Sequence, residues 1–231
     1  MMKHTTLKKQ LMAGILSMLV AVGICVGVAA DHYTTVNTAM EELAAATVAD
    51  DIDGWEEAQT EEGEVYLPDA EVPLGSNSTV TIKKLCPKAS STVRNVFEQL
   101  GFTVKIKGSV SYQGEMDAAA RTITLKTANS DNCYHELGHF VAFIAGNADK
   151  TSSFQAIYKA EKKKYTGRNK TYVTKNASEY FAESYREYIL KNSTLKKQRP
   201  KTYKAIKAAI ALVTPARATT LQKVYRAVWS R

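Results

Sequence analysis

The sequence predicts an α+β protein in which a small mixed β-sheet with helices is followed by a helical subdomain. Between residues 78 and 126, short segments alternate with the two-residue period of strands. From residue 131 onward, apolar residues recur at helical spacing. The 231 residues suffice for one domain with an appendage, and 45% hydrophobic and 23% charged residues exclude a wholly disordered chain and a multi-pass membrane protein.

The first 30 residues have the pattern of a secretory signal peptide. Lys3, Lys8 and Lys9 precede an uncharged run over residues 11–30, which ends in small residues suited to a signal peptidase. We expect cleavage after Ala30, so that the protein is secreted and the mature chain begins at Asp31. An uncleaved membrane anchor is the alternative, because residues 11–28 are of borderline length for a membrane span.

Charge divides the mature chain into two units. Residues 31–82 hold 13 Asp and Glu and no Lys or Arg, whereas residues 83–231 hold 28 basic and 10 acidic residues. This segregation predicts an acidic segment over residues 31–77 and a basic catalytic domain over residues 78–231. Two interpretations of the acidic segment stay open: a linker, or a pro-segment held on the basic domain by charge attraction.

The elements of the basic domain follow from residue patterns in chain order. Residues 78–84 alternate like a strand, and residues 90–100 place apolar side chains on one face of a helix that Gly101 ends. Further strands are expected at residues 102–107, 110–112 and 121–126. Helices are expected at residues 134–145, 153–163, 178–190, 203–213 and 221–229.

Residues 135–139 read His-Glu-Leu-Gly-His, the strongest chemical signal in the chain. On a helix, His135 and His139 lie on one face and can bind one metal ion, with Glu136 beside it as a base for water. These two are among the three histidines of the mature chain. The alternative is two histidines packed in a core.

Catalytic zinc needs a third protein ligand and one open position for water. No histidine follows His139, so the candidates are the downstream carboxylates. Glu161 lies in a lysine-rich stretch and is expected to be solvated, and Asp149 follows the first helix too closely to fold back easily.

The other three carboxylates recur at every fourth residue and share one face of the helix expected at residues 178–190: Glu179, Glu183 and Glu187. Glu187 is suited to a surface ion pair with Lys191. The residues alone leave Glu179 and Glu183 as equal candidates for the third ligand.

Residues 176–185 read Asn-Ala-Ser-Glu-Tyr-Phe-Ala-Glu-Ser-Tyr and resemble the second motif of the anthrax lethal factor catalytic domain and its secreted relatives, the Pro-Pro endopeptidases. The His-Glu-Leu-Gly-His segment and Arg-Pro-Lys-Thr-Tyr at residues 199–203 resemble the same family. The resemblance is strong over residues 131–205 and faint over 78–130, and it does not extend over 31–77 or 221–231. It implies a zinc metalloendopeptidase of the gluzincin type.

The resemblance also implies individual roles. Glu179 matches the metal ligand, Glu183 a residue that orients a ligand imidazole, and Tyr172 a hydroxyl that donates to the developing oxyanion. Glu136 takes the proton of a water that Zn²⁺ activates. Residues 121–126 are expected to form a sheet edge to which a substrate peptide adds as a strand.

Proline selectivity stays open. Family members that cut between two prolines carry a tryptophan-containing loop before the edge strand, whereas residues 108–120 are short here and the two tryptophans are Trp55 and Trp229. The fate of Cys86 and Cys133 stays open as well, between a disulfide and two buried thiols. A metal role for these cysteines is the least favoured, because it would close the site.

We therefore expect a secreted zinc endopeptidase that acts as a monomer on an extracellular protein or peptide and binds no nucleic acid. Its lysines favour acidic partners and association with an anionic cell surface. The alternative is a non-catalytic module that binds the cell surface or wall and holds a structural zinc. A structural site would be closed by four protein ligands.

Overall fold

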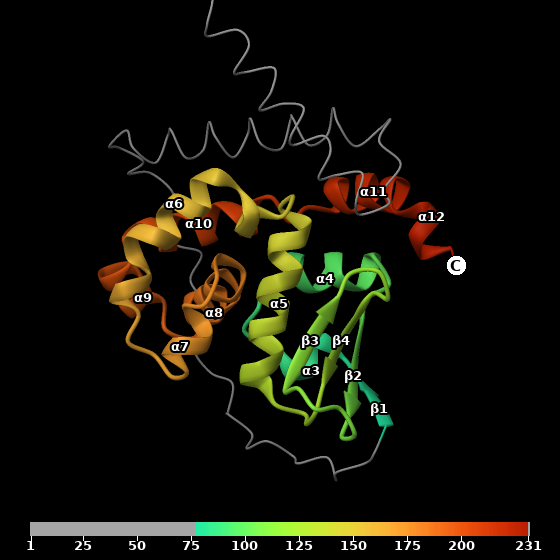
Figure 1. Ribbon diagram of the computed structural model, residues 1–231. Helices are drawn as coiled ribbons and strands as arrows, with labels where there is room; N and C mark the ends of the chain where they lie inside the picture. Colours follow the sequence, from blue (N-terminus) through green and yellow to red (C-terminus); the bar gives the residue numbers. More distant parts are fainter. Residues whose placement is uncertain (1–76, 231) are drawn as a thin grey trace, which may run out of the picture.

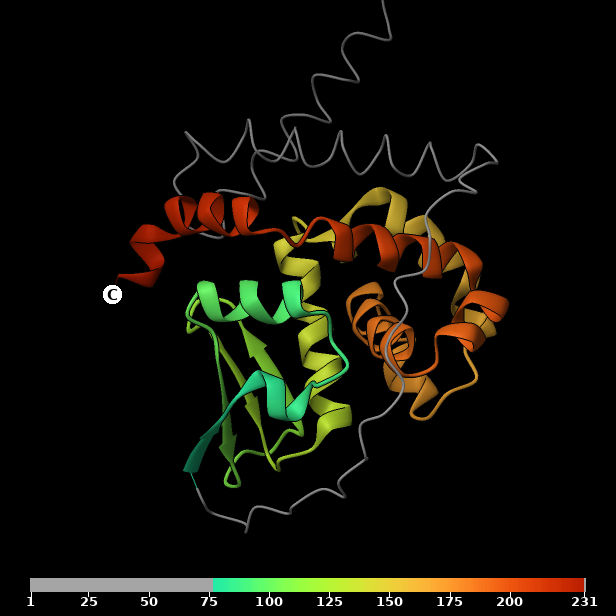
Figure 2. The same ribbon diagram turned by 180° about the vertical axis from the view of Figure 1, so that it is seen from behind.

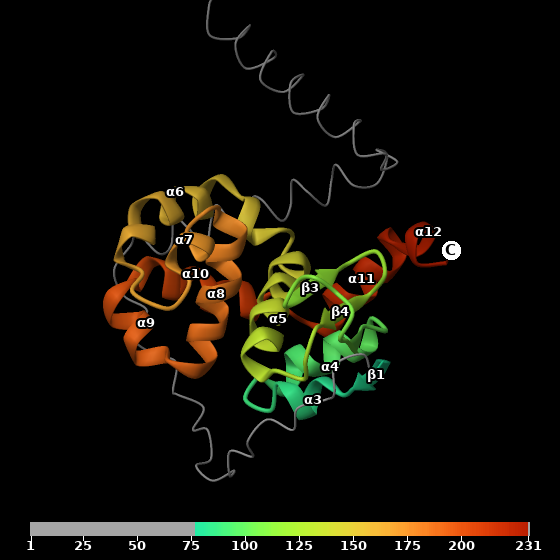
Figure 3. The same ribbon diagram turned by 60° about the horizontal axis from the view of Figure 1, so that its bottom comes forward.

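The computed structural model describes residues 77–230, and these form a mixed sheet and a bundle of helices on the two sides of one long helix, α5 (Ser130–Ile144) (Figures 1 and 3). The predicted α+β class is confirmed. The predicted signal peptide and residues 31–76 of the acidic segment lie outside the described residues. Within the described range, no helix combines the length and apolarity that crossing a membrane requires.

The sheet has four strands in the order β1-β2-β4-β3. β2 and β4 are parallel, whereas β1 pairs with β2 and β3 with β4 in antiparallel fashion. The strands are β1 (Asn77–Val80), β2 (Thr103–Lys107), β3 (Gly114–Asp117) and β4 (Thr122–Leu125).

Two predictions about this sheet are wrong. The strand expected at residues 110–112 lies instead at 114–117, where Gly-Glu-Met-Asp has no β-branched residue to signal it. This strand pairs with β4, so residues 121–126 are not a sheet edge, and the edge strands within residues 77–230 are β3 and β1. Asp117 closes the β3–β4 turn by accepting the backbone N–H groups of Ala119 and Ala120 at 2.8 and 2.9 Å.

The strand expected at residues 78–84 is shorter than predicted, because helix α3 (Ile82–Leu85) takes over its second half. Thr81 caps this helix by accepting the N–H of Lys84 at 3.3 Å. The helix expected at residues 90–100 is confirmed as α4 (Ser91–Gln99), with Ser90 as its cap. Figure 2 shows α3 and α4 from the side on which they cover the sheet.

The core of the sheet region lies between one face of the sheet and helices α4 and α5. Alternate residues of β2 and β4 are buried on this face, at Val104, Ile106, Ile123 and Leu125. Three phenylalanines, Phe97, Phe102 and Phe140, join the helices to the sheet with ring centroids 5.0–5.3 Å apart. The helix predicted at residues 134–145 is therefore a core helix, and aromatic packing at Phe140 joins it to the sheet and to α4.

The helical subdomain follows α5. Its helices are α6 (Ser152–Glu161), α7 (Lys170–Val173), α8 (Ala177–Leu190), α9 (Asn192–Gln198) and α10 (Pro200–Ala211). α11 (Pro215–Val224) and α12 (Arg226–Trp229) then return to the sheet, where Trp229 Nε1 donates to the Ala118 carbonyl at 2.9 Å. Proline at the start of α10 and of α11 suits the first helical turn, where no backbone N–H is needed.

α5 and α8 approach closely because Gly138 has no side chain. A Cβ at Gly138 would lie 2.7 Å from the Cα and the carbonyl oxygen of Ala182. The glycine of the His-Glu-Leu-Gly-His segment therefore brings the helix that carries the histidines against the helix that carries the carboxylates.

Cys86 and Cys133 are buried free thiols. They are close enough for a thiol–thiol hydrogen bond, and burial together with this bond raises the pKa of Cys86 well above its ordinary value. Of the alternatives left open by the sequence, the structure has two free thiols, and Cys133 is not part of the metal-binding group.

Two carboxylates expected on the surface are buried. Glu161 is 2% exposed and accepts the backbone N–H and the hydroxyl of Thr202 at 2.9 and 2.8 Å. Glu187 forms an ion pair with the buried guanidinium of Arg199, which also lies over the rings of Tyr165 and Tyr180. Helical spacing could not foresee these contacts, because both partners come from the segment around the start of α10.

Replacing Glu187 with alanine would leave the Arg199 charge buried and unpaired. We expect a loss of about 3–5 kcal/mol in the free energy of unfolding, as for other broken buried pairs, measured by urea denaturation. The control is Lys164→Ala, which removes an exposed ammonium 3.9 Å from Glu161 and should cost less than about 1 kcal/mol. Equal effects of the two substitutions would contradict the buried pair.

Candidate metal centre

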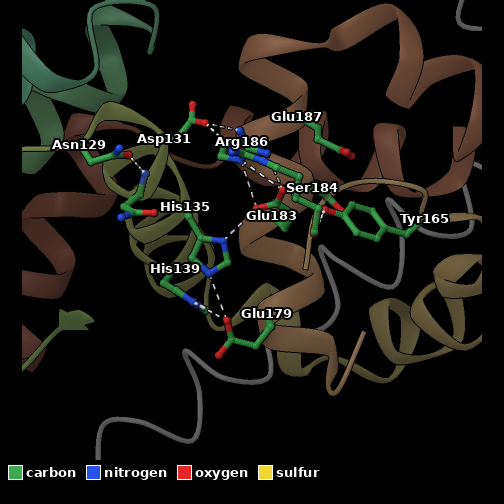
Figure 4. A network of polar contacts seen from close by, with 12 residues as sticks. Asn129, Asp131, His135, His139, Tyr165, Glu179, Glu183, Ser184, Arg186 and Glu187 are labelled. Carbon is green, nitrogen blue, oxygen red and sulfur yellow. Dashed lines mark hydrogen bonds and ion pairs between the residues drawn. The ribbon is translucent and has the colours of Figure 1, made fainter. Parts of the chain in front are cut away.

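His135 and His139 project from α5 toward Glu179 on α8 (Figure 4). Glu179 Oε2 lies 3.1 Å from His135 Nε2 and 3.7 Å from His139 Nε2. One ligand atom from each of the three residues lies within 4.8 Å of the other two, so one ion can contact all three. The structure thus brings the two predicted histidines together with Glu179, and not Glu183, as the third donor.

The donor set fits zinc. Two imidazole nitrogens and a carboxylate oxygen are common zinc ligands, and tetrahedral bonds of about 2.0–2.2 Å place ligand atoms roughly 3.3–3.6 Å apart. The distances of 3.1 and 3.7 Å to Glu179 Oε2 are near this range. The start of α8 holds Glu179 in place, because Asn176 caps the helix by accepting the Glu179 N–H at 2.8 Å.

Glu183 supports His135 from behind, as the resemblance implied. Its Oε2 lies 3.2 Å from His135 Nδ1, while its Oε1 accepts from Tyr165 at 3.1 Å and from Arg186 Nη2 at 2.7 Å. Burial alone would raise the pKa of Glu183, but the hydrogen bonds from His135 and Arg186 lower it to about 2. Because the ionised carboxylate of Glu183 binds one ring nitrogen of His135, Nδ1, the other ring nitrogen is directed toward a bound metal.

His139 has a different support, which the sequence did not reveal. Ser178 Oγ lies 3.5 Å from His139 Nδ1 and donates to Asp149 Oδ2 at 2.6 Å. Asp149 was expected not to fold back, but Gly146 and Asn147 take positive φ angles of 84° and 58° and reverse the chain directly after α5. In the sequence, the Gly146-Asn147 pair was the signal that could have predicted this reversal of the chain.

Glu136 lies beside the histidines on α5, with its carboxylate against the edge strand β3. Its carboxylate takes a backbone hydrogen bond from Met116, and a Cβ at Gly114 would lie 2.6 Å from its Oε1. Burial raises the pKa of Glu136, and the positive charges of His139 and His135 only partly offset this rise. Glu136, His139 and Glu179 line a pocket of about 350 Å³, together with residues of β3 and the segment after α5.

Tyr172 on α7 lies at the mouth of this pocket and is 50% exposed, so a bound molecule can reach its hydroxyl. Burial and hydrogen bonding to Glu179 raise its pKa. Lys175 is a further residue that the sequence did not point to. Its Nζ lies 3.7 Å from the centroid of the Tyr172 ring and 3.4 Å from Glu179 Oε1, so it holds positive charge beside both.

All six residues singled out in the sequence therefore meet in one place: His135, Glu136, His139, Tyr172, Glu179 and Glu183. The surrounding residues were missed, since Asp149, Ser178, Arg186 and Lys175 belong to no spacing pattern. Their contribution is electrostatic and depends on the packing of α8, α7 and the turn after α5 against the two histidines.

Comparison with known proteins identifies a family. The family described as "Anthrax toxin lethal factor, N- and C-terminal domain" matches residues 57–209, more than half of the chain. The match begins before residue 78, so the expectation that the likeness excludes the whole of residues 31–77 is wrong for residues 57–77. A search among curated proteins found no match.

The polar contacts of His135 make the stability of the metal-free protein depend on pH. Burial lowers the pKa of His135, but hydrogen bonds with Glu179 and Glu183 outweigh burial and raise it from 6.5 to about 9. Because the folded pKa exceeds the unfolded one, the stabilisation is complete below pH 6.5 and is lost as the pH rises through 9. The lowered pKa of Glu183 adds a second loss as the pH falls from 4.5 toward 2.

We therefore expect the protein in chelator to be most stable between pH 4.5 and 6.5 and to lose up to about 3 kcal/mol by pH 9.5. Urea denaturation at several pH values measures this. Glu183→Gln should flatten the loss between pH 6.5 and 9. If stability fell with pH as steeply in that variant as in the wild type, the contact between His135 and Glu183 would not set the pH dependence.

Proposed function

This chain belongs to the anthrax toxin lethal factor family, and from this premise we propose that it is a zinc-dependent endopeptidase. The observation that carries the proposal is the joint placement of three metal donors and a separate buried carboxylate on one pocket. A site that only held a metal would have no need for Glu136, whereas hydrolysis needs a base beside the ion.

His135, His139 and Glu179 would hold the metal, and Tyr172 and Lys175 would border it. Zn²⁺ bound there would polarise a peptide carbonyl and lower the pKa of a water to about 7. Glu183 and the Ser178–Asp149 pair keep the two imidazoles oriented from behind. This orientation lowers the cost of assembling the site when an ion binds.

Glu136 is the proposed base. Its carboxylate accepts a proton from the attacking water and later gives it to the leaving amine. Its position suits both steps, because Glu136 lines the pocket beside His139 and Glu179. The Tyr172 hydroxyl would leave Glu179 and donate to the oxygen of the carbonyl as negative charge develops there.

The edge strand β3 is the proposed binding site for the substrate backbone. Within the described chain β3 pairs on one side with β4, and its residues Glu115 and Met116 line the pocket. A peptide that adds to β3 as a further strand would pass Glu136 and the metal donors. We propose a protein or peptide substrate outside the cell, and we keep proline selectivity as an open property of this pocket.

The rival proposal is a binding module with a structural zinc. The group of donors in residues 77–230 has three members, whereas structural zinc sites use four protein ligands. The open, pocket-lining position of the group therefore supports the catalytic proposal over the rival one.

The proposal is tested by digesting a complex peptide library with residues 31–231 loaded with zinc, and reading the products by mass spectrometry. We expect cuts that disappear with chelator and fall at least about 10³-fold in Glu136→Gln, with one zinc still bound per chain. The residues flanking the cuts would give the selectivity, including any preference for proline. A folded, zinc-loaded protein that makes no cuts, both as residues 31–231 and as residues 78–231, would refute the endopeptidase.

Gly114 offers a test of the base's position that leaves the metal donors intact. A methyl group at this residue would displace the Glu136 carboxylate from β3. We expect Gly114→Ala to lower kcat/KM by about 10–100-fold, as for other misplaced catalytic groups, with zinc affinity unchanged. Gly108→Ala, in the loop after β2, is the matched control. Full activity of Gly114→Ala would contradict the placement of Glu136 against β3.

A further inference from the structure

The outer surface of the helical subdomain carries positive charge without exposed negative charge. Residues 150–230 contain four carboxylates. Glu161, Glu183 and Glu187 are buried, and Glu179 is held in the metal centre. Every acidic side chain of this region is therefore committed to an interior contact or to the site, and none is exposed to balance the surface lysines.

Five of the exposed lysines lie on α9 and α10. Lys196 and Lys197 on α9 and Lys201, Lys204 and Lys207 on α10 are all exposed, and we call these five the cationic face. Lys196 lies over the ring of Tyr203, 5.8 Å from its centroid, which ties the α9 lysines to α10. Three other exposed cations of the subdomain form ion pairs with carboxylates: Lys164, Arg168 and Lys175.

The cationic face lies away from the metal centre. α9 is on the far side of α8 from α5 (Figures 1 and 3), and none of the five lysines lines the pocket. A ligand of this face therefore does not need the site, and the face is not explained by the proposed catalysis. None of the five ammonium groups has a carboxylate partner among residues 77–230, and five such groups on two adjacent helices suit a chain of closely spaced anions.

The same chain contains such a polyanion. Residues 31–76 hold 13 Asp and Glu and no Lys or Arg, and they lead directly into β1 at Asn77. Forty-six residues can extend to about 150 Å at about 3.3 Å per residue, far beyond the radius of about 15 Å expected for the described domain. Covalent linkage gives the segment an effective concentration in the millimolar range, above that of most external partners.

We propose that the acidic segment, residues 31–76, docks on the cationic face of its own chain. The segment occupies the lysines of α9 and α10 and competes there with external polyanions such as phosphate polymers. Because the face is remote from the pocket, docking at this place regulates what the protein associates with and leaves the metal centre uncovered. The inference holds whether or not the chain is a peptidase.

Carbodiimide cross-linking of residues 31–231 tests the proposal, since it joins carboxylates to lysines only where they touch. A mixture of ¹⁵N-labelled and unlabelled chains separates links within a chain from links between chains. We expect links within one chain from residues 31–76 to the cationic face in low salt, at least about tenfold fewer in 0.5 M NaCl, where charges are screened within a few ångströms.

The matched variants are Lys196→Gln/Lys197→Gln and, as control, Lys83→Gln/Lys84→Gln, which removes two exposed adjacent lysines from α3. The first should reduce the links to Lys201, Lys204 and Lys207 several-fold, and the control should leave them unchanged. Circular dichroism checks that both variants fold. Links spread evenly over all exposed lysines, or formed only between chains, would overturn the proposal.

Short-chain polyphosphate provides the competing ligand. We expect it to displace the links to the cationic face at low salt. If polyphosphate binds and no links form in its absence, the face belongs to an external polyanion and the acidic segment is not its occupant. If the links persist while polyphosphate is bound, the two ligands do not share the lysines, which would contradict the proposed competition.

Discussion

The close contact between α5 and α8 at Gly138 is the constraint on which the metal centre depends. The backbone of Ala182 occupies the space of the missing side chain, so the two helices meet at a distance that larger residues would prevent. Only at this distance does Glu179 come within 3.1 and 3.7 Å of the two histidine nitrogens. Sheet and aromatic core fix α5 from one side, and Gly138 lets α8 pack closely against its other side.

The two histidines are held by different means. His135 rests on Glu183, whose charge is matched by Arg186 and a hydrogen bond from Tyr165. His139 rests on the neutral Ser178, with the carboxylate of Asp149 one step further away. The environment of His135 is therefore the more strongly polarised, which agrees with the raised pKa of this residue in the absence of a metal.

The distribution of acidic residues links the stability of the helical subdomain to its surface. Glu161, Glu183 and Glu187 are buried, where they bind backbone N–H groups or guanidinium groups and join α6, α8 and the start of α10. The surface is consequently left to the lysines. The charge asymmetry of the sequence is thus sharper in the folded domain than in the amino-acid count, because the fold hides the negative charges and exposes the positive ones.

The sequence by itself determined the elements whose signal is local. Residue spacing predicts the helices at residues 90–100 and 178–190, because spacing decides which side chains share a helix face. The motif at 135–139 and its likeness to the lethal factor family likewise follow from spacing or from matched residues. Even so, spacing alone left Glu179 and Glu183 equivalent, and their assignment needed the family resemblance and then the geometry.

Only the tertiary structure decided which strand is the edge, where Asp149 lies and which carboxylates are buried. β3 has no propensity signal and exists because β4 offers it a partner. Asp149 returns because two residues take positive φ angles, and Glu161 and Glu187 are buried by partners distant in the sequence. These outcomes depend on long-range packing, which compensates the cost of burying a charge, and no local pattern records it.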